Sequence, residues 1–235
     1  MLAIETRSIY YSGMSTREIT LPNYTEGQEI ANSLSHAFGV FLSLLGFPFL
    51  IVKAAKSGNV WAIVASSLFF FGALITYLGS AIYHGLPKSD VKKVWRVMDH
   101  CNIFFLIIGT YSPYCLVALR NYSLGWAWSI YGVVIFFGIA GIILNAIDMK
   151  KFAVLSMIDY LFTGWAIIIS FYPLTASIGF MNGTFLLLMG GISYTVGAIL
   201  YGIGGKKNQW FHFIFHLFVL LGTVLMFFSI YFYVI

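Results

Sequence analysis

Long apolar stretches alternate with short charged segments along this chain. Stretches without any Asp, Glu, Lys or Arg occupy residues 30–52, 57–87, 100–119, 121–147, 160–205 and 208–235. A membrane-spanning helix needs about 20 consecutive apolar residues. Most of these stretches therefore have the length of one span, and the 160–205 stretch is long enough for two.

Two turn signals divide the 160–205 stretch, namely Tyr172-Pro173 and Asn182-Gly183. The pattern thus predicts an all-α integral membrane protein with seven helices. We expect a cytoplasmic N-terminal segment at residues 1–28 and a seven-helix transmembrane domain at residues 29–235. The expected helices lie near residues 31–52, 60–83, 98–119, 125–146, 152–172, 181–202 and 211–234.

Composition supports a membrane protein and argues against a water-soluble one. Of the 235 residues, 60% are hydrophobic and 9% are charged, whereas soluble domains carry about 25% charged residues. The net charge of +5 does not indicate nucleic-acid binding, because basic residues in such a protein mainly mark cytoplasmic loops. We expect a multi-pass protein of the cell membrane whose partners are membrane lipids, and the oligomeric state stays open.

The basic residues predict the orientation of the seven helices. With the N-terminus in the cytoplasm and the C-terminus outside, ten basic residues fall on the cytoplasmic side and three on the outer side, as the positive-inside rule requires. The three are Lys53, Lys56 and Arg120. The ten are Arg7, Arg17, Lys88, Lys92, Lys93, Arg96, Lys150, Lys151, Lys206 and Lys207.

All five histidines fall near the cytoplasmic ends of the expected helices. His212 and His216 are four residues apart, so they share one helix face and can grip one metal ion. Ser80 and His84 have the same spacing. Three imidazoles plus a water are typical of an open, catalytic zinc site. The remaining histidines are His36 and His100.

Other readings of these residues stay open. A single histidine near a helix end can simply lie at the level of the lipid headgroups, and only the joint pattern favours a metal site. His100 diverges by about 100° from its neighbour Asp99 on a helix, so we expect it to anchor the interface. Asp159 would either pair within the bundle or line the same cavity as the histidines.

The chain resembles the hemolysin III proteins, a branch of the progestin and adipoQ receptor family. Four groups of residues carry the resemblance, which extends from Glu29 to His216. They are Glu29, Asn32 and His36 in an E-x-x-N-x-x-x-H pattern, the run from Ser80 to His84, then Asp99, and His212-x-x-x-His216.

The resemblance implies a seven-helix bundle with a zinc ion near the cytoplasmic face. His84, His212 and His216 would hold the metal, Asp99 would act through its bound water, and Ser80 would lie beside it. Glu29, Asn32 and His36 would support the site. The chain departs from the receptors at Phe213, where they carry a proline, and its N-terminal region is short.

Two classes of function are compatible with the resemblance. Receptor members and the similar alkaline ceramidases are linked to ceramide hydrolysis, which suggests a zinc-dependent hydrolase of a lipid amide or ester. Zinc would polarise the carbonyl and activate water, with Asp99 as general base. The hemolysin III branch is instead named for red-cell lysis attributed to pores. A non-enzymatic lipid sensor, receptor or transporter is a further alternative.

Overall fold

Helices make up almost all of the described chain. The computed structural model describes residues 19–205 and 207–235 and contains no strand within them. Residues 1–18, which include Arg7 and Arg17, and Lys206 lie outside the described residues. The elements are α1 (Glu26–Lys56), α2 (Val60–Gly85), α3 (Asp90–Pro113), η1 (Tyr114–Leu119), α4 (Arg120–Tyr122), α5 (Leu124–Asp148), α6 (Ala153–Trp165), η2 (Ala166–Ser170), α7 (Phe171–Ile178), η3 (Gly179–Thr184), α8 (Phe185–Gly204), α9 (Trp210–Ser229) and η4 (Ile230–Val234).

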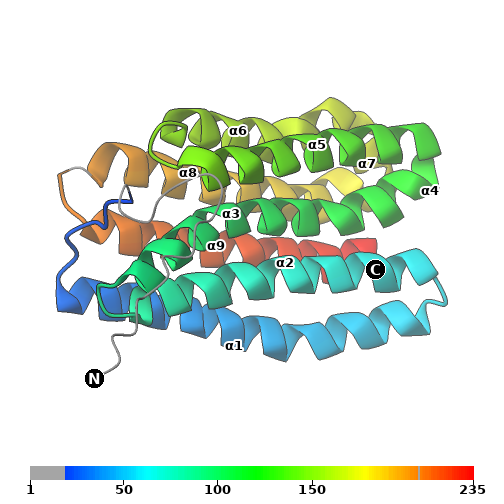
Figure 1. Cartoon of the computed structure of the whole chain (residues 1–235). Helices are drawn as coiled ribbons and strands as arrows, with labels where there is room; N and C mark the ends of the chain where they lie inside the picture. The colour runs from blue at the N-terminus through cyan, green and yellow to red at the C-terminus, as the bar shows by residue number, and fades with distance from the viewer. Residues whose placement is uncertain (1–18, 206) are drawn as a thin grey trace, which may run out of the picture.

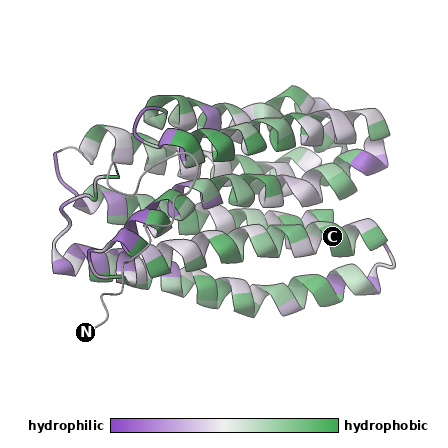
Figure 2. Cartoon of the chain, viewed as in Figure 1, coloured by the Kyte–Doolittle hydropathy of each residue, from purple (hydrophilic) through white to green (hydrophobic). Residues whose placement is uncertain are grey.

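The long helices lie side by side along one axis (Figure 1). α1 begins at the left of the view, and the C-terminus lies toward the opposite end. We call the end at which α1, α3 and α9 begin the polar end, because hydrophilic residues gather there (Figure 2). The other end, at which α9 finishes, is the C-terminal end.

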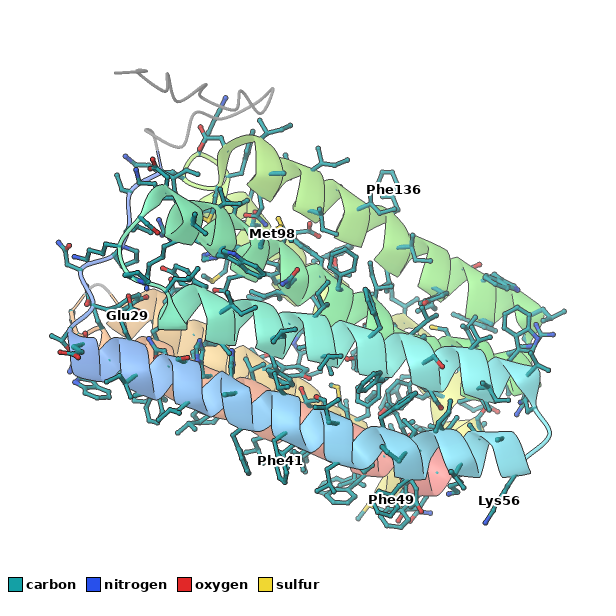
Figure 3. All side chains as sticks on the ribbon, turned by 60° about the horizontal axis from the view of Figure 1, so that its bottom comes forward. Glu29, Phe41, Phe49, Lys56, Met98 and Phe136 are labelled. Carbon is teal, nitrogen blue, oxygen red and sulfur yellow. The ribbon has the colours of Figure 1, made fainter. Side chains whose placement is uncertain are left out.

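Among the residues that the structure describes, six helical segments are long and apolar enough to cross a membrane. Large apolar side chains point outward from them, as Phe41, Phe49 and Phe136 show in Figure 3. Such a surface is favourable in lipid and costly in water. The segments are Glu26–Lys56, Val60–Gly85, Asp90–Tyr122, Leu124–Asp148, Ala153–Gly204 and Trp210–Val234.

The fifth segment, Ala153–Gly204, folds back on itself. Its 52 residues would measure about 78 Å as one straight helix. In such a helix Trp165 and Thr195 would be far apart, but the indole Nε1 of Trp165 donates to Thr195 Oγ1 at 2.9 Å. The reversal lies at η3, where Asn182 leaves helical geometry and Gly179 has a φ of 74°. The second of the two turn signals thus marks the reversal, and Pro173 is accommodated in the first turn of α7, where its missing N–H costs little.

The third long helix begins earlier than the sequence suggested. α3 starts at Asp90, and the Ser89 hydroxyl caps it by accepting from the Lys92 backbone N–H. Charged residues expected in a loop therefore lie in its first turns, among them Lys92 and Arg96. Charge density predicts where a helix leaves the apolar layer, not where its hydrogen bonding stops.

Close packing between α2 and α3 depends on glycines. A Cβ added at Gly72 would lie 2.3 Å from the backbone oxygen of Phe105, and one at Gly109 would lie 2.7 Å from that of Leu68. Backbone atoms cannot rotate away as side chains can. The two helices approach so closely only because these positions have no side chain.

Gly72→Ala is expected to destabilise the protein, because overpacking typically costs about 1–3 kcal/mol. The matched control is Gly132→Ala on α5, where an added Cβ would have nothing within 4 Å. Thermal unfolding of both variants in detergent, followed by size-exclusion chromatography, measures the effect. Equal melting temperatures for the two variants would contradict the packing described here.

Candidate metal centre

Three histidines from two helices meet at the polar end of the bundle. His84 comes from the last turn of α2, and His212 and His216 come from the start of α9. The Nε2 atom of His212 lies 3.1 Å from that of His84 and 3.0 Å from that of His216. All three side chains are buried, and their ligand atoms lie within 4.8 Å of one another.

Hydrogen bonds on the far side of two rings fix the direction of their lone pairs. His84 Nδ1 lies 2.7 Å from a carboxylate oxygen of Glu29. His216 Nδ1 lies 3.0 Å from the Ser35 hydroxyl, which itself donates to the Asn32 carbonyl. Because these partners accept, both Nδ1 atoms carry the proton, and the Nε2 lone pairs point inward.

This donor set fits a metal ion. Lone pairs that face one another without enough protons between them repel, and a cation at their meeting point removes the repulsion. Nitrogens bound to tetrahedral zinc at about 2.0 to 2.1 Å are separated by about 3.3 Å, close to the 3.0 and 3.1 Å found here. Carboxylate and carbonyl partners behind ligating imidazoles are typical of metal sites.

Several polar atoms beside the triad have no hydrogen-bond partner within the described residues. They belong to the Ser80 hydroxyl, the Asn32 side-chain amide and both ring nitrogens of His36, all buried. His36 stacks on His216 with ring centroids 3.6 Å apart. An unpartnered buried polar group costs about 1–3 kcal/mol, so these atoms mark where water or a ligand can bind.

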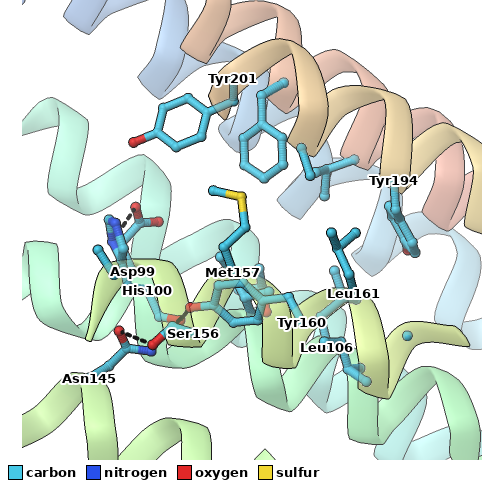
Figure 4. A pocket seen from close by; sticks show the side chains of 18 of the residues that line it. Asp99, His100, Leu106, Asn145, Ser156, Met157, Tyr160, Leu161, Tyr194 and Tyr201 are labelled. Atoms are coloured by element: carbon cyan, nitrogen blue, oxygen red, sulfur yellow. Dashed lines mark hydrogen bonds and ion pairs between the residues drawn. The ribbon is translucent and has the colours of Figure 1, made fainter. Parts of the chain in front are cut away.

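A cavity of about 550 Å³ opens beside the triad. His212, His216 and His36 line it, and so does Asp99 from α3 (Figure 4). The Asp99 carboxylate lies outside the group of three clustered ligands. The structure thus brings Asp99 to the same cavity as the histidines without placing it among the metal-ligating atoms.

His100 contacts the same cavity as its neighbour Asp99, whereas the sequence analysis expected the two side chains to diverge. It lines the cavity together with Asp99, and its Nδ1 lies 3.9 Å from an Asp99 oxygen. Adjacent helical residues do diverge by about 100°, but the cavity is broad enough to contact both. The ring also donates to the Arg96 carbonyl at 3.0 Å.

A second polar network on the cavity wall was missed by the sequence analysis. The Tyr160 hydroxyl donates to the His100 carbonyl at 2.9 Å and accepts from Asn145, which in turn accepts from Ser156 (Figure 4). The only sign of this network in the sequence is that polar residues stand inside apolar stretches. Asp159 is buried and accepts from Thr163 one turn away at 2.9 Å, so it pairs within its own helix.

Residues just before α1 cross the polar end of the site. Ile19 and Thr20 line the cavity, and the Arg96 guanidinium donates to the Thr20 carbonyl. The Tyr24 ring lies 5.6 Å from the His84 ring and 5.5 Å from the His212 ring, measured between centroids. The sequence assigns residues 19–24 to the cytoplasmic N-terminal segment, and nothing in it indicates that they reach the histidine triad.

Comparison with known proteins gives consistent matches over nearly the whole chain. A family model described as "Haemolysin-III related" matches residues 24–227. The hemolysin-3 homolog of Bacillus subtilis (strain 168) is 39% identical over 210 residues, which are 89% of this chain and 96% of that protein. The hemolysin-3 of Bacillus cereus is 36% identical over 219 residues, which are 93% and 97% of the two chains.

No solved structure matches the chain. The family match covers every residue that carried the resemblance, from Glu29 to His216. Together with the six apolar helical segments, these matches show that the chain belongs to the haemolysin-III related family, within the progestin and adipoQ receptor family, and is a multi-pass protein of the cell membrane.

Proposed function

We propose that this protein is a zinc-dependent hydrolase of a lipid amide or ester. The observation that carries the proposal is the convergence of three imidazole Nε2 atoms beside a cavity that is also lined by a carboxylate. Three imidazoles leave one coordination position of a tetrahedral ion open, as catalytic zinc sites do. Zinc is the metal proposed, since imidazole nitrogen suits it well.

Each nearby side chain has a task in this proposal. Zinc held by His84, His212 and His216 would polarise the substrate carbonyl and lower the pKa of its water toward about 7. Glu29 and Ser35 keep the rings of His84 and His216 oriented. These contacts hold two of the three lone pairs in place before a substrate arrives.

Asp99 is assigned as the general base. Its carboxylate lies in the cavity wall, where it can accept a proton from water as the carbonyl is attacked. Ser80 lies one turn before His84 on α2, and its buried hydroxyl has no partner among the described residues. We assign Ser80 to orient the water or the carbonyl.

The lining of the cavity supports a lipid substrate. Away from the histidines its wall is mostly apolar, with side chains from α3, α6 and α9 such as Leu106, Leu161 and Val219. Apolar pockets with a few convergent polar groups are typical of sites for small amphipathic ligands. An acyl chain fits this wall, with the amide or ester group at the triad.

A conducting pore is the competing function, and the packing of the C-terminal end argues against it. All six residues of η1 are buried in an apolar cluster there. Two buried hydroxyls in the same region bond to backbone carbonyls, Ser112 to Ala65 and Ser229 to Gly183. Those of Ser66, Tyr114 and Thr184 have no partner among the described residues, but they lie singly among apolar side chains. A water-filled pathway would need a continuous lining of polar groups through this half of the helices.

We propose seven membrane spans, with residues 1–28 in the cytoplasm and 29–235 forming the transmembrane domain. The reversal at η3 divides the 52-residue segment into two crossings, and a start and finish at opposite ends of the bundle require an odd number (Figure 1). The described basic residues also divide between the two ends as the positive-inside rule requires.

A reporter fused after Ile235 tests this topology. The reporter is an enzyme that works only outside the cytoplasm. We expect it to be active after Ile235, because seven spans from a cytoplasmic N-terminus leave the C-terminus outside. The matched control is the same reporter fused after Lys151, at the polar end between α5 and α6, which should be silent. Reporter activity after Lys151 together with silence after Ile235 would overturn this orientation.

Detergent-purified protein is expected to contain about one zinc ion per chain, and His212→Ala should lose it because two imidazoles remain. His100→Ala is the control, since His100 lines the cavity but lies outside the triad. Elemental analysis after dialysis measures the metal. A well-folded wild type that takes up no zinc when supplied would remove the basis of the hydrolase proposal.

Asp99→Asn should keep zinc while lowering lipid turnover by roughly 10²- to 10⁴-fold, the usual contribution of a general base. Asp159→Asn is the control, because that carboxylate bonds to Thr163 and does not line the cavity. The assay is a screen of amide- and ester-linked lipids in mixed micelles. Wild-type turnover in Asp99→Asn would exclude Asp99 as base, and vesicle leakage without any hydrolysis would favour the pore.

A further inference from the structure

Lys92 is a buried lysine in the first turn of α3. Only 2% of it is exposed, whereas lysine is almost never fully buried unless it is paired. Basic residues next to a span usually mark the cytoplasmic side and stay in water. A topology signal does not need burial, so the position of Lys92 requires another explanation.

The Lys92 ammonium group has three oxygen acceptors at the polar end. Its Nζ lies 2.8 Å from Glu29 Oε1, 2.8 Å from the Leu86 carbonyl and 3.3 Å from the His84 carbonyl. The Tyr83 ring centroid lies 5.2 Å away. These acceptors match the three hydrogens of an ammonium group, so the side chain is fixed in one position.

Glu29 divides its two oxygens between Lys92 and the histidine triad. Oε1 accepts from Lys92, and Oε2 accepts from His84 Nδ1 at 2.7 Å. A carboxylate held at one oxygen by a fixed ammonium cannot rotate its other oxygen freely. The orientation of His84 is therefore set through Glu29 by Lys92, although Lys92 touches no ligand nitrogen of the triad.

We propose that Lys92 is a positioning residue of the metal centre, which holds Glu29 so that its carboxylate orients His84 and stays out of the metal's coordination shell. The inference rests on the proposed zinc site. Without Lys92 the Glu29 carboxylate loses the ammonium that holds its Oε1, and it would be free to turn toward a divalent cation held by the triad. His84 then loses its partner, and the three-imidazole set is disturbed.

Lys92 also has a structural contact, which the test must separate from positioning. Its ammonium donates to the backbone carbonyls of His84 and Leu86, which have no hydrogen-bond partner within α2 because they lie at its C-terminal end. If this were its whole role, replacing Lys92 would lower stability by the same amount whether or not Glu29 is present. Positioning predicts instead that the effect on zinc binding passes through Glu29.

The test is a double-mutant cycle on the zinc affinity of the full chain in detergent, measured by competition with a chelating dye. Lys92→Met and Glu29→Gln should each weaken zinc binding by about 10- to 100-fold, the usual effect of losing an outer partner of a metal ligand. The double variant should be no weaker than the weaker single variant, because both changes remove one interaction. Lys93→Met, whose exposed ammonium pairs with Asp90 at 2.8 Å, should bind zinc as the wild type does.

Wild-type zinc affinity in Lys92→Met, or a double variant whose loss equals the product of the two single losses, would overturn the inference while leaving the zinc site intact. Absence of zinc binding in the wild type would overturn the proposed function and this inference together. If Lys92→Met does not fold, Glu29→Gln still tests a necessary step of the inference, since it keeps Lys92 and its bonds to α2. Unchanged zinc affinity in Glu29→Gln then overturns the inference.

Discussion

Glu29 has two carboxylate oxygens, and each ties α1 to a different helix. One accepts from His84 at the end of α2, and the other accepts from Lys92 at the start of α3. A carboxylate and an ammonium are costly inside a membrane bundle, and their mutual contact offsets part of that cost. Because His84 in turn meets α9 through His212, four helices have their relative positions fixed at the polar end by one connected set of contacts.

The two ends of the bundle differ in composition and in packing. The polar end holds the histidine triad, its cavity and most of the charged residues, whereas the C-terminal end is filled mainly by apolar side chains. A site that must hold a metal in fixed geometry benefits from a rigid support. The tightly packed contact of α2 with α3 through Gly72 and Gly109 holds the helix that carries His84 against its neighbour.

Hydropathy predicted the helices well because the requirement for an apolar lipid-facing surface is local and periodic. The i, i+4 spacing likewise identified His212 and His216 as a pair, since a helix fixes which residues share a face. The sequence did not fix where the chain reverses after α7, because it offered two turn signals about ten residues apart, and the structure places the reversal at the second, where Asn182 leaves helical geometry.

What the sequence could not reveal depends on contacts between distant helices. Lys92 looked like a topology signal, since nothing local says that a basic residue turns inward to Glu29 on another helix. The contact of His100 with the cavity was missed because local helix geometry does not report how wide a cavity is. Tyr24 precedes the first helix, and only the path of the chain across the polar end brings it to the histidines.

The separation of the triad along the chain has a consequence for its synthesis. His84 leaves the ribosome 128 residues ahead of His212, a delay of about 6 to 25 s at 5–20 residues per second. During that interval α1, α2 and α3 are in the membrane while α9 does not yet exist. The contact of Glu29 with Lys92 needs only those first three helices, so it can neutralise their buried charges while the nascent chain waits for its last helix.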